Sequence, residues 1–223
     1  VYGMHNWPGR PIGTFAIRPG PFFAATDTFE IVIEGKGGHA AKPNETVDSI
    51  VMAAQCVTAL QTIAARNADP VEQIVVSVTS FESSSKAFNV IPQSVTLRGT
   101  VRTLTPEMRA LGRDRIHDIC THTAAVFGGV AHITYIEGYP ATVNHEAETK
   151  FAAEAATKVA GECDFAPLVM GGEDFSYMLE ERPGAYILMG NGDGASVHHP
   201  EYNFNDEAIP AGCSWWVEMA ETR

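Results

Sequence analysis

The feature that most constrains the fold is the way the hydrophobic period changes between residues 24 and 138. Residues 27–35 alternate polar and apolar side chains, which is typical of a half-buried strand. A glycine-rich turn follows, and residues 47–66 then carry apolar side chains at helical spacing, with Asn44 or Thr46 as the candidate N-cap. A strand is therefore followed directly by a helix.

The same alternation continues downstream. Residues 73–81 are rich in β-branched side chains, and residues 94–102 alternate cleanly, so both predict strands. A second helix is expected from about residue 105 to 127, with Pro in its first turn and Gly128-Gly129 after its end, and residues 131–137 then read as a strand. The order strand–helix–strand–strand–helix–strand predicts a ferredoxin-like, split βαβ domain.

The flanking segments have a different pattern. Residues 1–23 are rich in glycine and proline, whereas residues 139–223 predict helices, a strand and a closing helix. The expected helices cover 146–160, about 173–181 and the segment from 206 onward, and the expected strand is A-Y-I-L-M. We therefore expect three ranges: α/β-domain segments at 1–23 and 139–223, and an inserted small domain at 24–138.

Composition narrows the class of partner. The chain has 223 residues and a formal net charge of −12, from 27 acidic and 15 basic residues. This charge disfavours nucleic acid or an anionic membrane as the main partner. No run approaches the roughly 20 apolar residues of a membrane span. The four cysteines form no C-x-x-C pair, which favours free thiols in a cytoplasmic protein.

Histidine-containing runs stand near both ends of the chain. H-N-W-P begins at His5, and V-H-H-P-E-Y-N-F-N-D-E contains His198 and His199. Each run resembles part of a divided metal site, but a hydrolytic metal site needs more ligands, a water and normally a carboxylate base. Because the chain also starts at Val1 without Met, we expect an excerpt of a longer protein.

Five motifs in order resemble a known family. They are H-N-W-P, G-K-G-G-H-A-A-K-P with V-D after it, F-N-V-I-P followed by G-T-V-R, M-G-G-E-D-F, and H-H-P-E-Y-N-F-N-D-E. The chain is similar to metal-dependent amidohydrolases that include hippurate hydrolase, auxin-conjugate hydrolase, aminoacylases and N-acyl amino acid amidohydrolases. The resemblance covers essentially the whole chain.

The resemblance implies a fold and a placement. The chain is expected to be the C-terminal portion of such an enzyme. Its fold class would be α/β, with the ferredoxin-like βαββαβ domain at 24–138 acting as a lid/dimerisation domain inserted in the C-terminal part of a two-metal α/β hydrolase domain. The other ligands and the catalytic glutamate would lie before Val1.

The resemblance also implies metal ligands. His5 is expected to bind one of two divalent metal ions, Zn or Mn, and His198 the other. The alternative for His5 is a loop histidine bonded to backbone. His199 stays open as the ligand in place of His198, because two neighbouring residues of a strand point to opposite faces and relatives often carry Ser or Thr at the second position.

Three residues of the small domain would contact substrate. His39 is implied to reach the neighbouring subunit's site and donate to the scissile carbonyl as a catalytic residue. Asn89 and Arg102 are implied to bind the substrate carboxylate. The alternatives are a solvated turn histidine for His39, a turn-shaping amide for Asn89, and an ion pair with an acidic neighbour for Arg102.

Glu173 and Asp174 in M-G-G-E-D-F have a simpler explanation. Carboxylates are favoured where a helix begins, because its first amides are unpaired and the macrodipole is positive there. A pocket-lining role is the alternative, and we do not assign the general base to either residue.

The expected function is metal-dependent hydrolysis of the amide bond of an N-acyl or N-aroyl amino acid by the complete enzyme, a homodimer. In such an enzyme two metals activate a water and polarise the carbonyl, while a glutamate moves the proton. One alternative is a non-catalytic dimerisation or ligand-binding module. Another is a dipeptidase or carboxypeptidase of the same mechanism.

The 223-residue chain on its own is expected to bind metal weakly or not at all and to lack hydrolase activity. Intact mass and bound metal, measured together on purified protein, test this expectation. A mass near 24 kDa with no metal fits it, whereas metal-dependent turnover by a chain of that mass would contradict it.

Overall fold

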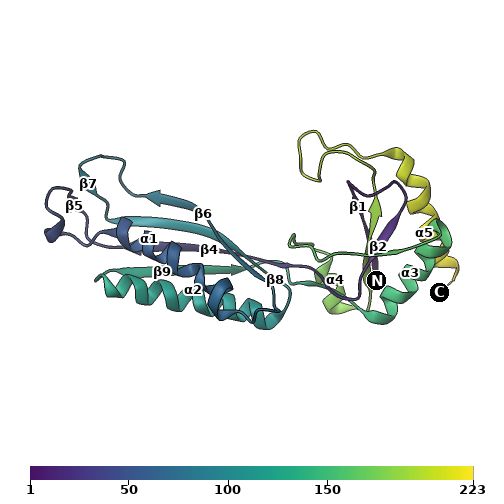
Figure 1. The fold of residues 1–223 in the computed structure, drawn as a ribbon, viewed down its shortest axis with the longest axis horizontal. Coiled ribbons are helices and arrows are strands. Elements are labelled where there is room, and N and C mark those ends of the chain that lie inside the picture. The colour runs from purple at the N-terminus through teal and green to yellow at the C-terminus, as the bar shows by residue number, and fades with distance from the viewer. Residues whose placement is uncertain (223) are drawn as a thin grey trace. The chain divides into compact units, whose positions relative to one another are not determined.

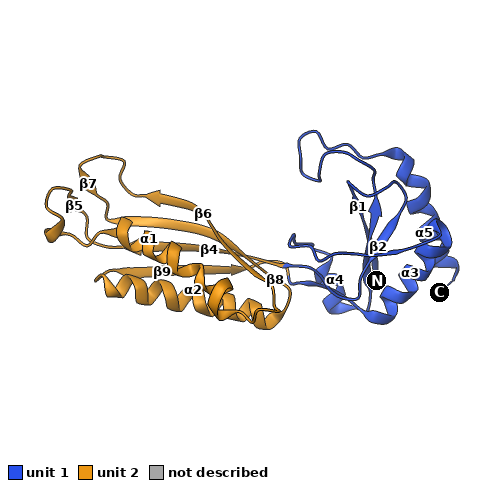
Figure 2. Cartoon of the chain, viewed as in Figure 1, with its two compact units in different colours: residues 1–24, 140–223 blue, residues 25–139 orange. Residues whose placement is uncertain are grey.

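The computed structural model describes residues 1–222 and divides the chain into two compact units (Figures 1 and 2). Unit 1 comprises Val1–Ala24 and Pro140–Arg223, and unit 2 comprises Ala25–Tyr139. The ranges expected from the sequence, 1–23, 24–138 and 139–223, stay a prediction. Within residues 1–222, no helix combines the length and the apolar character needed to cross a membrane.

Unit 1 is built on a mixed four-stranded sheet with the order β1-β12-β2-β11. β1 is parallel to β12, β2 is antiparallel to β12, and β11 is parallel to β2. β10 and β3 form a separate antiparallel pair. The elements of unit 1 are β1 (Tyr2–Trp7), β2 (Phe15–Ile17), β3 (Gly20–Phe23), β10 (Thr142–Asn144), α3 (Glu146–Ala160), β11 (Asp164–Phe165), α4 (Ser176–Glu181), β12 (Ala185–Gly190), η3 (Asp206–Ala208) and α5 (Ile209–Glu221).

A buried aromatic side chain organises the helical side of this sheet. Trp215 of α5 is fully buried beside Phe15 of β2, and its indole N–H donates to the carbonyl of Ala152 on α3 at 3.1 Å. This bond satisfies the one polar atom of the ring, so the indole can be buried without an unpaired donor. Trp215 thereby joins α5, α3 and the sheet in one core.

Unit 2 is an antiparallel four-stranded sheet with the order β6-β8-β4-β9, together with a short β5–β7 ribbon. Helices α1 and α2 pack on one face of the sheet, where their apolar stripes meet the inward side chains of the strands. The elements of unit 2 are β4 (Ala25–Glu34), β5 (Gly38–His39), η1 (Pro43–Glu45), α1 (Ser49–Leu60), η2 (Ile63–Asn67), β6 (Ile74–Ser83), β7 (Val90–Ile91), β8 (Ser94–Thr103), α2 (Pro106–Val126) and β9 (Val130–Glu137).

The expected strands and helices of this region are confirmed in order, but one cap differs. Helix α1 begins after Asp48, whose carboxylate accepts from the backbone N–H groups of Ile50 and Val51 at 2.9 and 3.3 Å. Asn44 and Thr46 were therefore wrong as caps, because both lie at the short helix η1 and its end. Helix α2 begins as expected, with Thr105 as N-cap and Pro106 in the first turn.

A buried ion pair stabilises one end of unit 2. Asp27 of β4 is 1% exposed and accepts hydrogen bonds from Arg109 Nε on α2 at 2.9 Å, from Tyr135 Oη on β9 at 2.7 Å and from the Gly138 N–H at 3.1 Å. Burial alone would raise the pKa of Asp27, but the hydrogen bonds from Arg109, Tyr135 and Gly138 outweigh it, and the pKa lies below its ordinary value. The charged carboxylate therefore holds β4, α2 and β9 together.

Replacing this carboxylate is expected to destabilise unit 2. Asp27→Asn should lower the free energy of unfolding by about 3 kcal/mol near neutral pH, because Arg109 would be left partly buried without its counter-charge. The three tryptophans all lie in unit 1. Urea unfolding followed by far-ultraviolet circular dichroism should therefore show the loss, while tryptophan fluorescence should change little.

The control and the pH dependence sharpen this test. Glu30→Gln removes an exposed partner of Arg98 and should cost less than about 1 kcal/mol. Because the folded-state pKa of Asp27 is lowered from 3.8, the stabilisation is complete above that value and is lost as the pH falls through the folded-state pKa. Equal effects of the two variants, or a difference that persists at the lowest pH, would contradict the role of Asp27.

Candidate metal and substrate site

His5 presents one ring nitrogen that is free to bind a metal. It lies on β1, in edge contact with the rings of Trp7 and Tyr186. Its Nδ1 is 2.6 Å from the carbonyl oxygen of Asn6. A carbonyl only accepts, so in the neutral ring Nδ1 carries the proton and Nε2 keeps its lone pair. Metal-binding histidines are commonly oriented by such a bond from the other nitrogen.

The loop that carries His198 is anchored to the end of β1. The side-chain amide of Asn6 donates to the hydroxyl of Tyr202, and the Asn191 N–H donates to the Trp7 carbonyl at 3.1 Å. Asn6 and Trp7, the two residues directly after His5, therefore hold the loop in place. His5 and the loop of His198 belong to the same region of unit 1.

His198 and His199 differ in backbone and in hydrogen bonding. His198 lies in a turn and neither residue belongs to a strand, so the alternation that a strand would impose on the pair does not apply. In the described part of the chain, His198 is the one non-glycine residue with a positive φ, at 69°. His199 Nδ1 accepts from the Glu201 N–H at 3.1 Å. Neutral His199 therefore carries its proton on Nε2 and offers no free lone pair.

Residues 1–222 do not bring together a complete metal site. Among residues 1–222, no group of three or more His, Cys, Asp or Glu side chains is placed so that it could hold a metal ion. The chemistry of His5 fits a metal ligand, but a catalytic site normally has three protein ligands per metal. Donors in addition to His5 and His198 would be required.

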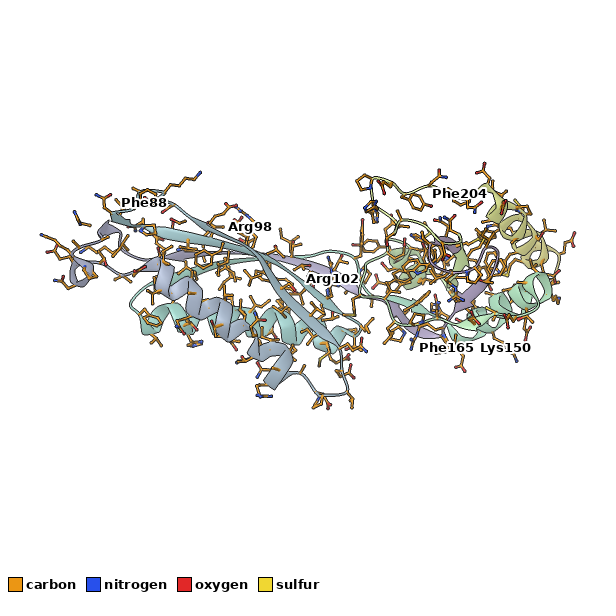
Figure 3. The ribbon with its side chains drawn as sticks, turned by 45° about the horizontal axis from the view of Figure 1, so that its top comes forward. Phe88, Arg98, Arg102, Lys150, Phe165 and Phe204 are labelled. Carbon is orange, nitrogen blue, oxygen red and sulfur yellow. The ribbon has the colours of Figure 1, made fainter. Side chains whose placement is uncertain are left out.

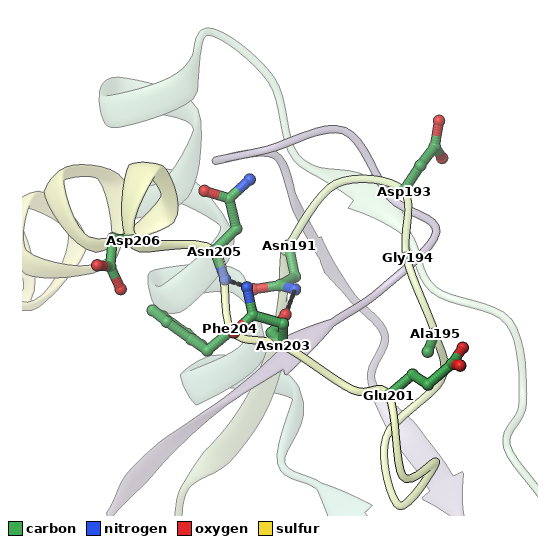
Figure 4. Close-up of a pocket in the computed structure, with 9 residues that line it drawn as sticks. All are labelled: Asn191, Asp193, Gly194, Ala195, Glu201, Asn203, Phe204, Asn205 and Asp206. Atoms are coloured by element: carbon green, nitrogen blue, oxygen red, sulfur yellow. Dashed lines mark hydrogen bonds between the residues drawn. The ribbon is translucent and has the colours of Figure 1, made fainter.

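The loop also lines a polar cavity that the sequence patterns did not predict. The cavity has a volume of about 430 Å³, and three of its lining residues, Asp193, Glu201 and Asp206, are acidic (Figure 4). Asn191 fixes its shape, since its side chain donates to the Asn203 carbonyl at 3.2 Å and accepts from the Asn205 N–H at 2.9 Å. The run N-G-D-G before the histidines was the available signal, because such runs form turns.

His39 has the opposite hydrogen-bonding character to His5. It lies on β5 opposite Val90 of β7, and its Nδ1 accepts from the Ala41 N–H at 3.1 Å. Neutral His39 therefore carries its proton on Nε2, on an exposed side chain. The Ala40 N–H donates to the Asn89 carbonyl at 3.0 Å. The structure thus brings the expected residues His39 and Asn89 together on one ribbon.

Arg102 lies far from that ribbon. It is near the end of β8, opposite Thr26 and Val75, whereas β8 begins at Ser94, close to the ribbon. Eight residues of extended strand span about 26 Å. Figure 3 likewise shows Arg102 and Phe88, the neighbour of Asn89, at separate ends of unit 2. The structure therefore does not bring Arg102 to His39.

The guanidinium of Arg102 is available to a ligand. Its neighbour Arg98 binds Glu30 and Glu82 at 2.8 and 3.0 Å. Arg102 has no ion pair with any carboxylate in residues 1–222. The alternative of an acidic neighbour as its partner is thus not observed within the described chain.

Glu173 has a structural role in this fold. Its Oε2 accepts from the Tyr186 hydroxyl at 2.8 Å, and its Oε1 accepts from the Phe175 N–H at 3.3 Å. Burial, together with this bond to Glu173, raises the pKa of the Tyr186 hydroxyl. Since Tyr186 contacts the ring of His5, Glu173 orients one wall of the His5 environment. The helix expected from 173 begins at Ser176.

A family model and several known proteins match most of the chain. The family model for peptidase family M20/M25/M40 matches residues 1–222. N-acetyl-L-cysteine deacetylase of Bacillus subtilis is 38% identical over 99% of this chain and 53% of its own length. Hippurate hydrolase of Campylobacter jejuni is 34% identical over 99% and 58%. Thermostable carboxypeptidase 2 of Saccharolobus solfataricus is 36% identical over 85% and 48%. The chain thus spans about half the length of these relatives.

Solved structures agree with the family match. A protein from methicillin-resistant Staphylococcus aureus aligns with a TM-score of 0.88 at 30% identity, over 99% of this chain and 58% of its own. A Bacillus subtilis protein described as a dinuclear metal binding peptidase from the M20 family aligns with a TM-score of 0.83 at 31% identity, over 98% and 55%.

The comparisons correct the expected placement of the chain. We expected the C-terminal portion of the family, containing the lid/dimerisation domain. The family model instead matches residues 1–222 in one stretch, which places the chain in the family's catalytic region, so that interpretation was wrong. Short motifs report local chemistry and identify a family, but they do not locate a segment within it.

The expected fold class was also wrong. The family match runs through both compact units, so both belong to the α/β fold of the M20 catalytic region, and residues 24–138 are not a lid/dimerisation domain added to it. Hydrophobic periods report the order of strands and helices, but an insertion is defined by comparison with the fold of relatives. With the match extending over residues 1–222, the chain belongs to peptidase family M20/M25/M40.

Proposed function

We propose that the whole protein is a metal-dependent amidohydrolase that cleaves an N-acyl or N-aroyl amino acid into a carboxylic acid and an amino acid. The observation that carries this proposal is the free Nε2 of His5, held by the bond between Nδ1 and the Asn6 carbonyl. The names of the relatives, a deacetylase of an N-acetyl amino acid and a hippurate hydrolase, support the substrate class.

His5 and His198 are the proposed metal ligands. His198 is preferred over His199 because the Glu201 N–H already occupies the acceptor nitrogen of His199. Two divalent metals, Zn or Mn, would supply a water of lowered pKa and polarise the amide carbonyl. The residues around His5 hold its ring, since Trp7 and Tyr186 form T-shaped ring contacts with it.

His39, Asn89 and Arg102 are the proposed substrate-contacting residues. The exposed Nε2–H of His39 is a donor suited to an amide oxygen on which negative charge develops. The amide of Asn89, on the same ribbon, would add a hydrogen bond to the substrate. Arg102 would pair with the substrate carboxylate, for which it has a free guanidinium.

The separation within unit 2 supports a homodimer. Arg102 lies about 26 Å along β8 from Ser94, the end of the strand that is close to the ribbon of His39, and this length exceeds that of a small N-acyl amino acid. One substrate molecule could contact both residues only if they come from two copies of the chain. Dimerisation stays a proposal, and β6 and β9 are the edge strands of the sheet that a second copy would meet.

A peptidase is the second candidate, because one relative is named a thermostable carboxypeptidase. Both candidates hydrolyse an amide beside a carboxylate, so metal content does not separate them. Turnover of N-acyl amino acids and of dipeptides by the whole protein, measured side by side, does. Faster turnover of dipeptides would replace the amidohydrolase proposal, and turnover of neither would favour a non-catalytic binding module.

His5→Ala is expected to weaken metal binding by at least about 10-fold, because the variant removes a lone pair that coordinates the ion. Titration of the whole protein with Mn²⁺ or Zn²⁺ by calorimetry measures the effect. His122→Ala is the matched control, since His122 is an exposed histidine whose Nδ1 donates to the Asp118 carbonyl. Equal affinities of the two variants would remove His5 from the site.

His39→Ala is expected to lower kcat of the whole protein about 100-fold or more, as loss of an oxyanion donor does, with a small change in KM. His132→Ala, on the same unit and paired with Glu34, is the control. Arg102→Met should instead raise KM. Mixed dimers of the His39→Ala and Arg102→Met chains should regain activity, because one site then has both residues. Absence of this complementation would place both residues in one subunit's site.

A further inference from the structure

The side chains of β1 divide between the two faces of the sheet in unit 1. Tyr2 and Met4 pack into the core that contains α3 and α5, and Trp7 packs into the core on the opposite face. Because successive side chains of a strand point to opposite faces, Gly3 and His5 lie on the face of Trp7. The imidazole of His5 is therefore on the side of the sheet away from α3 and α5.

Gly3 leaves room for an aromatic ring beside His5. Gly3 is the register partner of Tyr186 on β12, so the Tyr186 side chain projects from the same face. A Cβ atom at Gly3 would lie 2.6 Å from Cδ2 of Tyr186 and 3.0 Å from the ring of Phe175, and the first distance is too short for two carbon atoms. The Tyr186 ring thus lies over Gly3. Its centroid is 6.2 Å from that of His5, with the two rings at 80°.

The ring and the backbone of Tyr186 are both held in place. The residue is 6% exposed, and its ring stacks on Phe175 and meets Phe23 edge-on, with centroids 5.0 and 5.8 Å apart. The hydroxyl donates to Glu173 Oε2 at 2.8 Å. The N–H donates to Asn144 Oδ1 at 2.7 Å, and the carbonyl accepts from the Asn144 side-chain amide at 2.9 Å. A shift of Tyr186 would break buried packing and hydrogen bonds, so the ring has one position.

This fixed ring restricts the imidazole of His5. The bond from Nδ1 to the Asn6 carbonyl determines which nitrogen carries the proton. The T-shaped contacts with Tyr186 and Trp7, which come from two different strands, limit rotation of the ring. A side chain that is already oriented loses less conformational freedom when it binds a metal, so its affinity for the metal is higher.

We propose that Tyr186 is a positioning residue for metal binding, which holds the imidazole of His5 so that Nε2 faces the metal. Gly3 supplies the space for the Tyr186 ring, and Glu173 supplies the acceptor for its hydroxyl. Because that hydroxyl donates to Glu173, Tyr186 is assigned to hold His5 and not to bind the metal. This role rests on the proposed function, in which His5 is a metal ligand.

Gly3→Ala displaces the Tyr186 ring while every polar group around His5 is kept. The affinity of the whole protein for Mn²⁺, measured by calorimetry, should fall by about 10-fold, as it does when a group that orients a metal ligand is lost. Gly171→Ala is the matched control, since a Cβ at Gly171 meets no atom closer than 3.6 Å. The affinity of this control should be unchanged.

Variants of Glu173 separate positioning from general stability. Glu173→Gln keeps an oxygen that can accept from the Tyr186 hydroxyl, so it should retain most of the affinity for Mn²⁺. Glu173→Ala should weaken binding by roughly 10-fold, because the hydroxyl loses its acceptor. Asp174→Asn removes an exposed carboxylate from the same segment and should have no effect. A residue that only stabilised the fold would change the thermal midpoint and leave the affinity of the folded protein unchanged.

A readout without metal reports the orientation of His5 directly. Nitrogen-15 NMR of the metal-free whole protein, at a pH where histidine is neutral and with the signals assigned by His5→Ala, should show one tautomer with the proton on Nδ1. In Gly3→Ala the released ring should populate both tautomers, so its two nitrogen shifts should move toward each other. Tryptophan fluorescence, which reports unit 1, should show a cooperative unfolding transition for each variant.

The outcomes separate this role from the proposed function. If His5→Ala leaves the Mn²⁺ affinity unchanged, the proposed function fails and the role of Tyr186 fails with it. If His5→Ala weakens binding, but a folded Gly3→Ala protein keeps the wild-type affinity and a single tautomer, His5 stays a ligand and the positioning role is overturned. Equal affinities of Glu173→Ala and the wild type would overturn it even where Gly3→Ala does not fold.

Discussion

The ion pair of Asp27 and Arg109 is the constraint on which unit 2 depends. A carboxylate that is 1% exposed would be costly without partners, but Arg109, Tyr135 and the Gly138 amide surround it with donors. These donors come from a helix, a strand and the residue just after that strand. The ion pair therefore fixes where α2 and β9 meet β4. Apolar packing in the core of the unit has no directional preference. The directional hydrogen bonds of Asp27 instead specify how α2 and β9 are positioned against β4.

The histidines of this chain are sorted by what their Nδ1 atoms contact. His5 faces a carbonyl and must donate to it, which leaves a lone pair on Nε2. His39 and His199 face amides and must accept, which leaves a proton on Nε2. An imidazole with a lone pair suits a metal, and one with a proton suits a developing oxyanion. A backbone carbonyl or N–H group one or two residues along the chain thus determines which ring nitrogen of each histidine carries the proton.

The sequence predicted the order of elements well because each of them has a local cause. The alternation of 94–102 produces β8, and Thr105-Pro106 starts α2. The α1 cap was missed because several polar residues precede the helix, and which of them adopts the cap geometry depends on η1. The site residues likewise fall into those whose positions follow from local sequence and those whose positions depend on the folded structure. The pairing of His39 with the Asn89 segment follows from a short ribbon, whereas the tautomers and the 191–206 cavity depend on loop hydrogen bonds that no pattern encodes.

Placement within the family was beyond the reach of local patterns, and so was the distance between His39 and Arg102. Both residues belong to motifs that suggested one binding site, yet β8 is a ten-residue strand paired on both sides, and it holds them apart. A sheet with a packed helical layer does not bend enough to bring its ends together. If both residues act on one substrate, the rigidity of unit 2 makes a second copy of the chain part of the site.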